Sequence, residues 1–244
     1  MVETGSDKSF LLQKQAGNSS RQPLEVYHLS HDLRGPLNSI LGFAELLVEG
    51  IEGPLNDVQI EDISAIHQSA QTLLKLINTV VDLSRLEAGR LALNFEPVDL
   101  LHVMNKVLAD KTVKADLVTV EIPDSFPALN GDRERVEQMV LNLVIFALKV
   151  KNVREVRISA THNNTDATLT IKAVEGIISA RDLEDLFDLT VEVDDTGRSK
   201  LTEGGLQMPL TQKLAATYQG KIWTEMQAEA GLTFYLQLPL YRPD

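Results

Sequence analysis

The chain has 244 residues, of which 43% are hydrophobic, and a formal net charge of -12 at pH 7. This composition is typical of a globular protein with one large domain or two ordinary ones. The acidic balance argues against nucleic acid or an anionic membrane as a partner, because both bind clustered Lys and Arg. Since there is no cysteine, disulfides and thiolate chemistry are excluded, which fits a reducing compartment.

The N-terminus gives no sign of a membrane anchor or a secretion signal. No apolar run approaches the roughly 20 residues of a membrane-spanning helix, and no basic flank precedes an apolar segment. We therefore expect a cytoplasmic protein. Residues 1–22 are polar and aperiodic and are interpreted as a flexible tail, followed by two predicted domains at residues 23–93 and 94–244.

The first predicted domain is a helical hairpin. Residues 24–49 and 56–89 both have a helical pattern of apolar residues, and Gly50, Gly53 and Pro54 lie between them. Glycine and proline stop the first helix and turn the chain.

Both helices carry a heptad seam of the coiled-coil type. Its members, alternately three and four residues apart, are Leu33, Leu37, Ile40, Ala44 and Leu47 in the first helix and Ile63, Ile66, Ala70, Leu73, Ile77 and Val80 in the second. Flanking apolar residues widen each stripe beyond what one antiparallel helix covers, so two hairpins are predicted to pair as a homodimeric four-helix bundle. The alternative is that the second domain covers the extra stripe.

His31 falls on the outer face of the first helix when the seam residues are placed at heptad positions a and d. Asp32 follows it, Arg34 lies one turn away, and Pro36 removes the backbone hydrogen bond to the carbonyl of Asp32. We therefore expect an exposed histidine beside a locally distorted helix. Spacing alone does not distinguish a functional histidine from a solvated one.

The sequence around His31 identifies a family. The segment is Ser30-His31-Asp32-Leu33-Arg34-Gly35-Pro36-Leu37-Asn38-Ser39-Ile40. It resembles the phosphoacceptor box of sensor histidine kinases. Residues 83–89 resemble the end of the second dimerisation helix in that family, and residues 95–100 are similar to the segment that leads into its ATP-binding domain.

The resemblance implies that His31 carries a phosphoryl group and that Asp32 accepts a hydrogen bond from its ring. Imidazole, with an ordinary pKa of about 6.5, offers a free ring nitrogen as a nucleophile at neutral pH. The implied partner is a receiver domain of a response regulator, which we expect to dock around Arg34, Asn38 and Phe43. Many relatives have Thr or Asn at the position of Gly35, so a phosphatase activity that uses that side chain is not expected here.

The second predicted domain is an α/β sandwich, which makes the whole chain α+β. Helices are expected at residues 100–111, 132–149 and 206–218, and strands at 118–122, 156–160, 169–173, 221–225 and 232–238. Asn163, Asn164, Thr165 and Asp166 form a predicted turn between two of the strands. The order of elements resembles the GHKL ATPase domain of histidine kinases.

The nucleotide site departs from the family pattern. The resemblance places Asn142 at the first of two helix asparagines, but Phe146 stands at the second, which holds Mg²⁺ in relatives, and Mg²⁺ needs oxygen ligands. At the Asp-x-Gly-x-Gly motif this chain has Ala173, Glu175 and Ile177, which lack the adenine partner and add side chains.

Other nucleotide motifs are partial. The later glycine-rich box keeps Gly204 and Gly205 only, and Lys149 matches a position near the nucleotide but is equally explained by solvation. Residues 194–197, Asp-Asp-Thr-Gly, resemble the adenine motif but come after the short helix that should follow it, so they are interpreted as a turn.

These observations predict a histidine phosphotransferase of the pseudo-histidine kinase type. His31 would exchange a phosphoryl group with receiver aspartates without ATP-dependent autophosphorylation, the chain would bind no cofactor, and the receiver would supply Mg²⁺. ATP-dependent histidine kinase activity is disfavoured by Phe146. Two alternatives stay open: an active sensor histidine kinase with a divergent ATP site, and a non-catalytic scaffold that binds a kinase or regulator.

Overall fold

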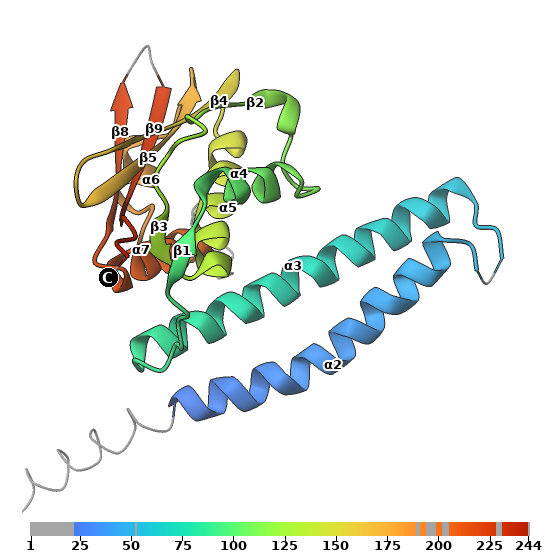
Figure 1. Ribbon diagram of the computed structural model, residues 1–244. Helices are drawn as coiled ribbons and strands as arrows, with labels where there is room; N and C mark the ends of the chain where they lie inside the picture. The colour runs from blue at the N-terminus through green and yellow to red at the C-terminus, as the bar shows by residue number, and fades with distance from the viewer. Residues whose placement is uncertain are drawn as a thin grey trace, which may run out of the picture. The chain divides into compact units, whose positions relative to one another are not determined.

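The computed structural model describes residues 22–51, 53–188, 191–193, 199–201, 205–227 and 231–243. The chain forms two compact units, Met1–Leu91 and Ala92–Asp244 (Figure 1). The predicted domain boundary, after residue 93, lies two residues further along. The predicted tail lies outside the described residues except for its last position. None of the described helices is long and apolar enough to cross a membrane.

The first unit is the expected helical hairpin, made of α2 (Gln22–Val48) and α3 (Asp57–Glu87). Gly50 and Gly53 adopt φ values of 71° and 124°, which glycine tolerates best, and so turn the chain between the helices. α3 begins with a capping box: the Asn56 side chain accepts from the Gln59 amide at 2.9 Å, and the Gln59 side chain accepts from the Asn56 amide at 3.0 Å. Local sequence therefore fixes both the turn and the start of α3.

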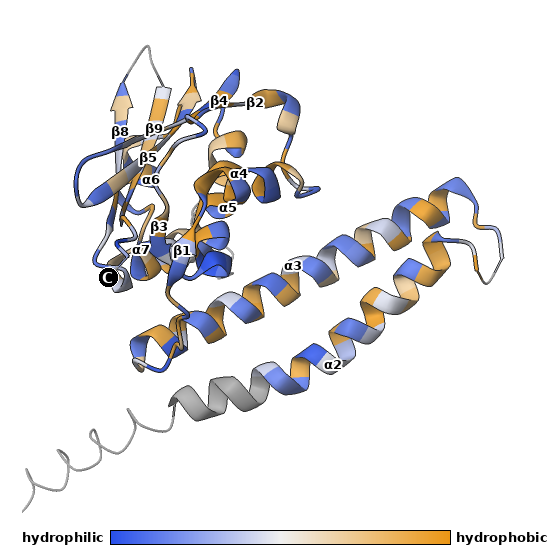
Figure 2. Ribbon diagram, in the orientation of Figure 1, coloured by the Kyte–Doolittle hydropathy of each residue, from blue (hydrophilic) through white to orange (hydrophobic). Residues whose placement is uncertain are grey.

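The heptad seam divides into two halves within this hairpin. One half is buried inside a single chain, with Leu37, Ala44 and Ala70 at most 6% exposed. The other half remains exposed, and its residues recur every seven positions: Leu33 and Ile40 on α2, and Ile66, Leu73 and Val80 on α3. Figure 2 shows hydrophobic residues interspersed with hydrophilic ones along both helices. A single hairpin thus covers only part of its apolar surface.

The second unit is built on a five-stranded mixed sheet in the order β2-β4-β5-β9-β8. The strands are β2 (Val118–Glu121), β4 (Glu155–His162), β5 (Asp166–Val174), β8 (Lys221–Gln227) and β9 (Gly231–Pro239). β2 pairs with β4 in parallel, and the other neighbours are antiparallel. In the predicted turn between β4 and β5, the Asn163 side chain accepts from the amides of Thr165 and Asp166.

The second unit also contains helical elements. They are α4 (Leu100–Leu108), a 3₁₀ turn (Ala115–Leu117), α5 (Arg133–Lys149), α6 (Ala180–Glu184) and α7 (Gln207–Thr217). α5 packs against β4 and β5, and α7 packs against β8 and β9. The short strands β1 (Glu96–Val98) and β3 (Leu129–Gly131) form a separate antiparallel pair, as do β6 (Val191–Val193) and β7 (Ser199–Leu201). The predicted α+β fold, a helical hairpin followed by an α/β sandwich, is confirmed.

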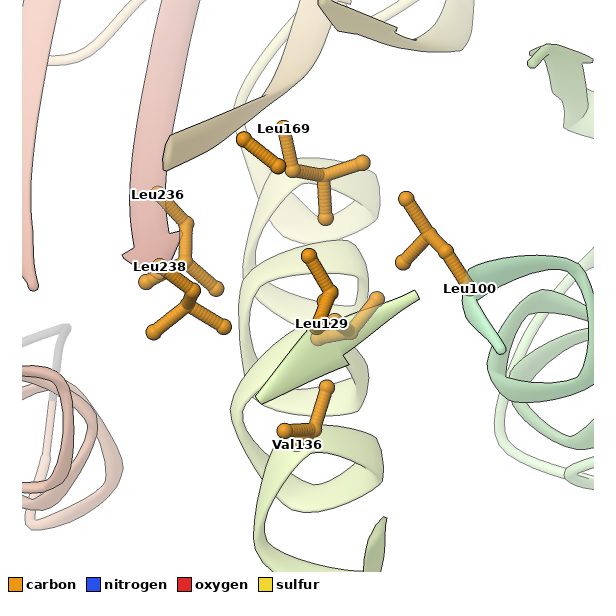
Figure 3. A pocket seen from close by; sticks show the side chains of 8 residues that line it. Leu100, Leu129, Val136, Leu169, Leu236 and Leu238 are labelled. Atoms are coloured by element: carbon orange, nitrogen blue, oxygen red, sulfur yellow. The ribbon is translucent and has the colours of Figure 1, made fainter. Parts of the chain in front are cut away.

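The core between helices and sheet is apolar and closely packed. Alternate residues of β5 face it, from Ala167 through Ile171 to Ala173, and are almost fully buried. The core contains a gap of about 10 Å³, and Figure 3 shows the side chains that line it. Its lining is entirely aliphatic: Leu100, Leu129, Val136, Val140, Ala167, Leu169, Leu236 and Leu238. Because a bound water needs polar partners, this gap is a packing defect and not a ligand site.

Candidate functional site

His31 projects from α2 into solvent, beside an acidic neighbour. The side chains of His31 and Asp32 are both 78% exposed, and Nδ1 of His31 lies 3.5 Å from Oδ1 of Asp32. Among the residues that the structure describes, Nε2 of His31 has no partner. The carboxylate therefore faces one ring nitrogen and leaves the other open as a nucleophile.

The helix beside His31 is weakened at two consecutive positions. Pro36 lies inside α2 and lacks the N–H that would bond to the carbonyl of Asp32. A Cβ added to Gly35 would meet nothing within 4 Å, so the surface one turn from His31 is bare. The Ser39 hydroxyl donates to the carbonyl of Gly35 at 3.2 Å, a bond common to serine inside helices.

The predicted docking residues do not share one environment. Asn38 and Phe43 are exposed, Phe43 by 64%. Arg34 is partly buried, and its Nε and Nη2 both donate to Oδ1 of Asn78 on α3, at 3.1 and 2.8 Å. Sequence reasoning placed Arg34 on the outer face and missed Asn78, because helical phase does not tell how far a long side chain reaches across a hairpin.

Two positions of the predicted nucleotide site lie on α5. Nδ2 of Asn142 donates to the Thr211 hydroxyl on α7 at 3.1 Å, and this hydroxyl donates to the carbonyl of Gln207 at 2.8 Å. Phe146, 8% exposed, meets Phe234 of β9 edge to face, with ring centroids 5.7 Å apart. Asn142 joins two helices, and Phe146 joins α5 to the sheet.

The positions of the Asp-x-Gly-x-Gly motif lie at and after the end of β5. Ala173 is fully buried in the core. Glu175 has φ 60° and pairs with Arg154 at 3.5 Å on the surface. Ile177 is half exposed, and its amide donates to the carbonyl of Lys151 at 2.9 Å. This segment therefore caps the sheet with a tight turn and a backbone bond.

The remaining nucleotide positions are only partly described. Gly205 has φ 53° and precedes α7, and Lys149 is exposed. Residues 194–197, Glu203 and Gly204 lie outside the described residues. In the described ranges no three or more His, Asp or Glu residues gather as a metal site. The predictions about cofactors stay predictions.

A polar cluster that the sequence did not predict lies around Asp132, at the start of α5. Asp132 caps α5: its Oδ1 accepts from the Arg135 amide at 3.2 Å and its Oδ2 from the Asn94 amide at 2.9 Å. The Asp132 amide in turn donates to the Tyr218 hydroxyl at 3.2 Å. Burial raises the pKa of Tyr218 to about 12. Phe95 lies against the Tyr218 ring, with centroids 5.1 Å apart.

Two family models match the chain. Residues 24–89 match the His Kinase A (phospho-acceptor) domain, and residues 131–242 match the histidine kinase-, DNA gyrase B- and HSP90-like ATPase domain. The first match contains the exposed His31, and the second spans α5 and most of the sheet.

Curated relatives are similar over nearly the whole chain. Histidine protein kinase DivJ of Caulobacter vibrioides is 32% identical over 87% of this chain and 36% of its own length. The signal transduction histidine-protein kinase BarA of Escherichia coli is 30% identical over 94% of this chain and 26% of its own length. The chain thus spans about a third or less of the length of these relatives.

Solved structures share the fold. ShkA, crystallised at full length with AMPPNP, superposes with a TM-score of 0.68 at 23% identity, over 89% of this chain and 46% of that one. The Acinetobacter baumannii histidine kinase AdeS gives a TM-score of 0.59 at 21% identity, over 87% and 98%. At these identities the likeness concerns the fold alone.

The comparisons correct one prediction. ATP-dependent histidine kinase activity was disfavoured because of a few departures at single positions, yet the relatives that align along nearly the whole chain are named as histidine kinases. The disfavoured activity is therefore the one that the comparisons support. Single positions such as 146 are a weak guide because they also serve the packing of the second unit. The chain contains a His Kinase A phosphoacceptor domain and a histidine kinase-type ATPase domain, and it is homologous to sensor histidine kinases.

Proposed function

We propose that this chain is the phosphoacceptor and ATPase-like core of a two-component histidine kinase. His31 takes a phosphoryl group, with ATP as the donor, and passes it to an aspartate of a receiver domain. The observation that carries the proposal is the 78% exposed His31, which stands beside Asp32 within the matched phosphoacceptor domain. The match to an ATPase domain, together with relatives that are named as histidine kinases, supports ATP as the donor.

The chemistry follows from the ring geometry. The lone pair on Nε2 attacks phosphorus, an N–P bond forms, and the bond from phosphorus to the leaving oxygen breaks with its electron pair going to that oxygen. Asp32, 3.5 Å from Nδ1, stabilises the positive charge that the ring acquires. In the second step a receiver carboxylate attacks phosphorus and the N–P electron pair returns to Nε2.

In the second step, the transfer from His31 to the receiver carboxylate, the receiver domain supplies Mg²⁺. For the first step, Asn142 is bonded to Thr211 and Phe146 offers no oxygen, so these two residues do not fit a magnesium ligand pair.

We further propose a homodimer, joined through the exposed half of the heptad seam. Ile66, Leu73 and Val80 recur every seven residues on α3 and are 40–53% exposed in the single chain. A second hairpin packed on this stripe would complete a four-helix bundle. The receiver would then dock on the outer face of α2, where Asn38 and Phe43 are exposed.

Radiolabelled phosphoryl transfer tests the proposal. The wild-type chain, His31→Gln and the matched control His102→Gln, which changes an exposed histidine of the second unit, are each incubated with ATP labelled at the γ-position. We expect acid-labile label on the wild type and on His102→Gln, and none on His31→Gln.

A second arm separates the donor from the acceptor. The same three proteins are mixed with a panel of phosphorylated receiver domains from the same organism. Label that reaches His31 from receivers but not from ATP would overturn ATP as the donor and keep His31 as the acceptor. No label from either source would overturn the proposal and favour a scaffold.

A further inference from the structure

Arg34 lies one turn along α2 from His31, and its guanidinium is held in place by α3. Residues three apart on a helix are surface neighbours, with Cβ atoms about 5–6 Å apart. Nε and Nη2 of Arg34 converge on a single atom, Oδ1 of Asn78, at 3.1 and 2.8 Å. This fork fixes the guanidinium plane, which a lysine could not reproduce.

The partner of Arg34 is neutral. Within the described parts of the chain, Arg34 has no carboxylate partner, because its bonds go to the amide oxygen of Asn78. An amide oxygen orients a guanidinium and leaves its positive charge uncompensated. An aspartate at position 78, which has nearly the same shape as asparagine, would hold the Arg34 guanidinium more strongly and cancel its positive charge.

A phosphoryl group on His31 adds negative charge one turn along α2 from this cation. A protein-bound phosphoryl group carries about -1.5 to -2 charges at neutral pH and seeks guanidinium donors. Asp32, on the other side, is itself negative and lies 3.5 Å from Nδ1 of His31. Of these two neighbours, only Arg34 attracts an incoming phosphoryl group.

We infer that Asn78 is a positioning residue, which holds the uncompensated charge of Arg34 beside the phosphoryl group as it moves onto and off His31. The inference rests on the proposed function, because it assumes that His31 is the acceptor. Its rival is a purely structural bond that only joins α2 to α3. The two differ in what they predict for Asn78→Asp, which keeps the bond and removes the net charge.

Phosphoramidate is the probe, since it needs neither ATP nor a known receiver. Nε2 of His31 attacks its phosphorus, the new N–P bond forms, and ammonia leaves with the electron pair of the old one. The rate of phosphorylation of the full chain is followed by ³¹P NMR as a function of phosphoramidate concentration, which separates the maximal rate from half-saturation. Thermal unfolding of each variant is measured in parallel.

We expect Asn78→Asp to unfold at the same temperature as the wild type or higher, and to slow phosphorylation roughly fivefold, the scale of one exposed charge contact. Arg34→Gln should slow it at least as much, and Arg34→Lys should recover part of the rate. Asn105→Asp, on the exposed surface of α4, is the matched control for the added charge and should change neither quantity.

Equal rates for wild type and Asn78→Asp would overturn the positioning role and leave a structural bond, with the proposed function intact. Failure of phosphoramidate to modify His31 in the wild type would instead overturn the phosphoacceptor assignment itself, and the inference with it. The two failures are therefore distinguishable.

Discussion

The rings of Phe146 and Phe234 meet edge to face, with centroids 5.7 Å apart and an interplanar angle of 81°. Phe146 belongs to α5 and Phe234, fully buried, to β9, so the pair joins the main helix of the second unit to an inner strand of its sheet. Edge-to-face aromatic pairs add to the stability that burial provides.

Phe146→Ala should therefore lower the free energy of unfolding of the second unit by about 3 to 4 kcal/mol, because it opens a cavity in a packed core. Urea unfolding followed by circular dichroism measures this loss. Phe146→Leu, which keeps most of the volume, should cost about 1.5 kcal/mol or less. Equal effects of the two variants would show that the ring pair does not support the core.

His31→Gln should leave the free energy of unfolding within about 0.5 kcal/mol of the wild-type value. The His31 side chain is 78% exposed, so its replacement opens no cavity. The same variant should lose all phosphoryl labelling. Thermal unfolding and labelling on one preparation check both statements. A large fall in stability would mean that His31 has a structural role.

Because of the Tyr218 hydroxyl, we expect the folded protein to lose stability at high pH. Its pKa rises from 10.0 in the unfolded chain to about 12 in the folded one, because of burial. Between these values the unfolded chain releases the proton and the folded chain keeps it, so stability is complete below pH 10 and falls as the pH rises toward 12.

Tyr218→Phe removes the titrating hydroxyl and with it this pH dependence. The substitution also lowers the free energy of unfolding by about 1 kcal/mol, because the Asp132 amide loses its acceptor. The wild type should therefore lose more stability than Tyr218→Phe between about pH 9 and about pH 11, as measured by urea unfolding. Parallel pH profiles for the two proteins would contradict the assignment.

Gly35→Ala should stabilise the hairpin by about 0.5 to 1 kcal/mol, because alanine favours the helix and its Cβ would meet nothing within 4 Å. Thermal unfolding measures the change. Gly131→Ala is the contrasting control: its Cβ would lie 2.9 Å from Cε1 of Tyr218, so it should destabilise the second unit. Destabilisation by Gly35→Ala would mean that the bare surface is covered in the assembled protein.

Ile66→Glu should weaken the proposed dimer. Ile66 is 53% exposed in the single chain, and a carboxylate there would be desolvated between paired hairpins. Analytical ultracentrifugation over a concentration series measures the dissociation constant. Gln68→Glu, an exposed position on the same helix, adds the same charge and should leave the association unchanged. Equal effects would place the interface elsewhere.

Local signals account for the elements that were predicted well. Gly50 and Gly53 fixed the turn, and the capping box of Asn56 and Gln59 fixed the start of α3. Period-two alternation located β5, whose inward residues are almost fully buried. The β1–β3 pair was missed, because each strand has three residues and the pairing joins segments more than 30 residues apart.

For this protein, the sequence alone determined the family, the hairpin and the exposed position of His31, since a long motif and helical periodicity are local properties of the chain. Only the tertiary structure decided that Asn78 holds Arg34, that Phe146 packs on Phe234 and that half of the heptad seam stays open in one chain. Each of these depends on two distant segments meeting in space. The reach of a side chain across such a gap is set by packing, which periodicity along one helix does not contain.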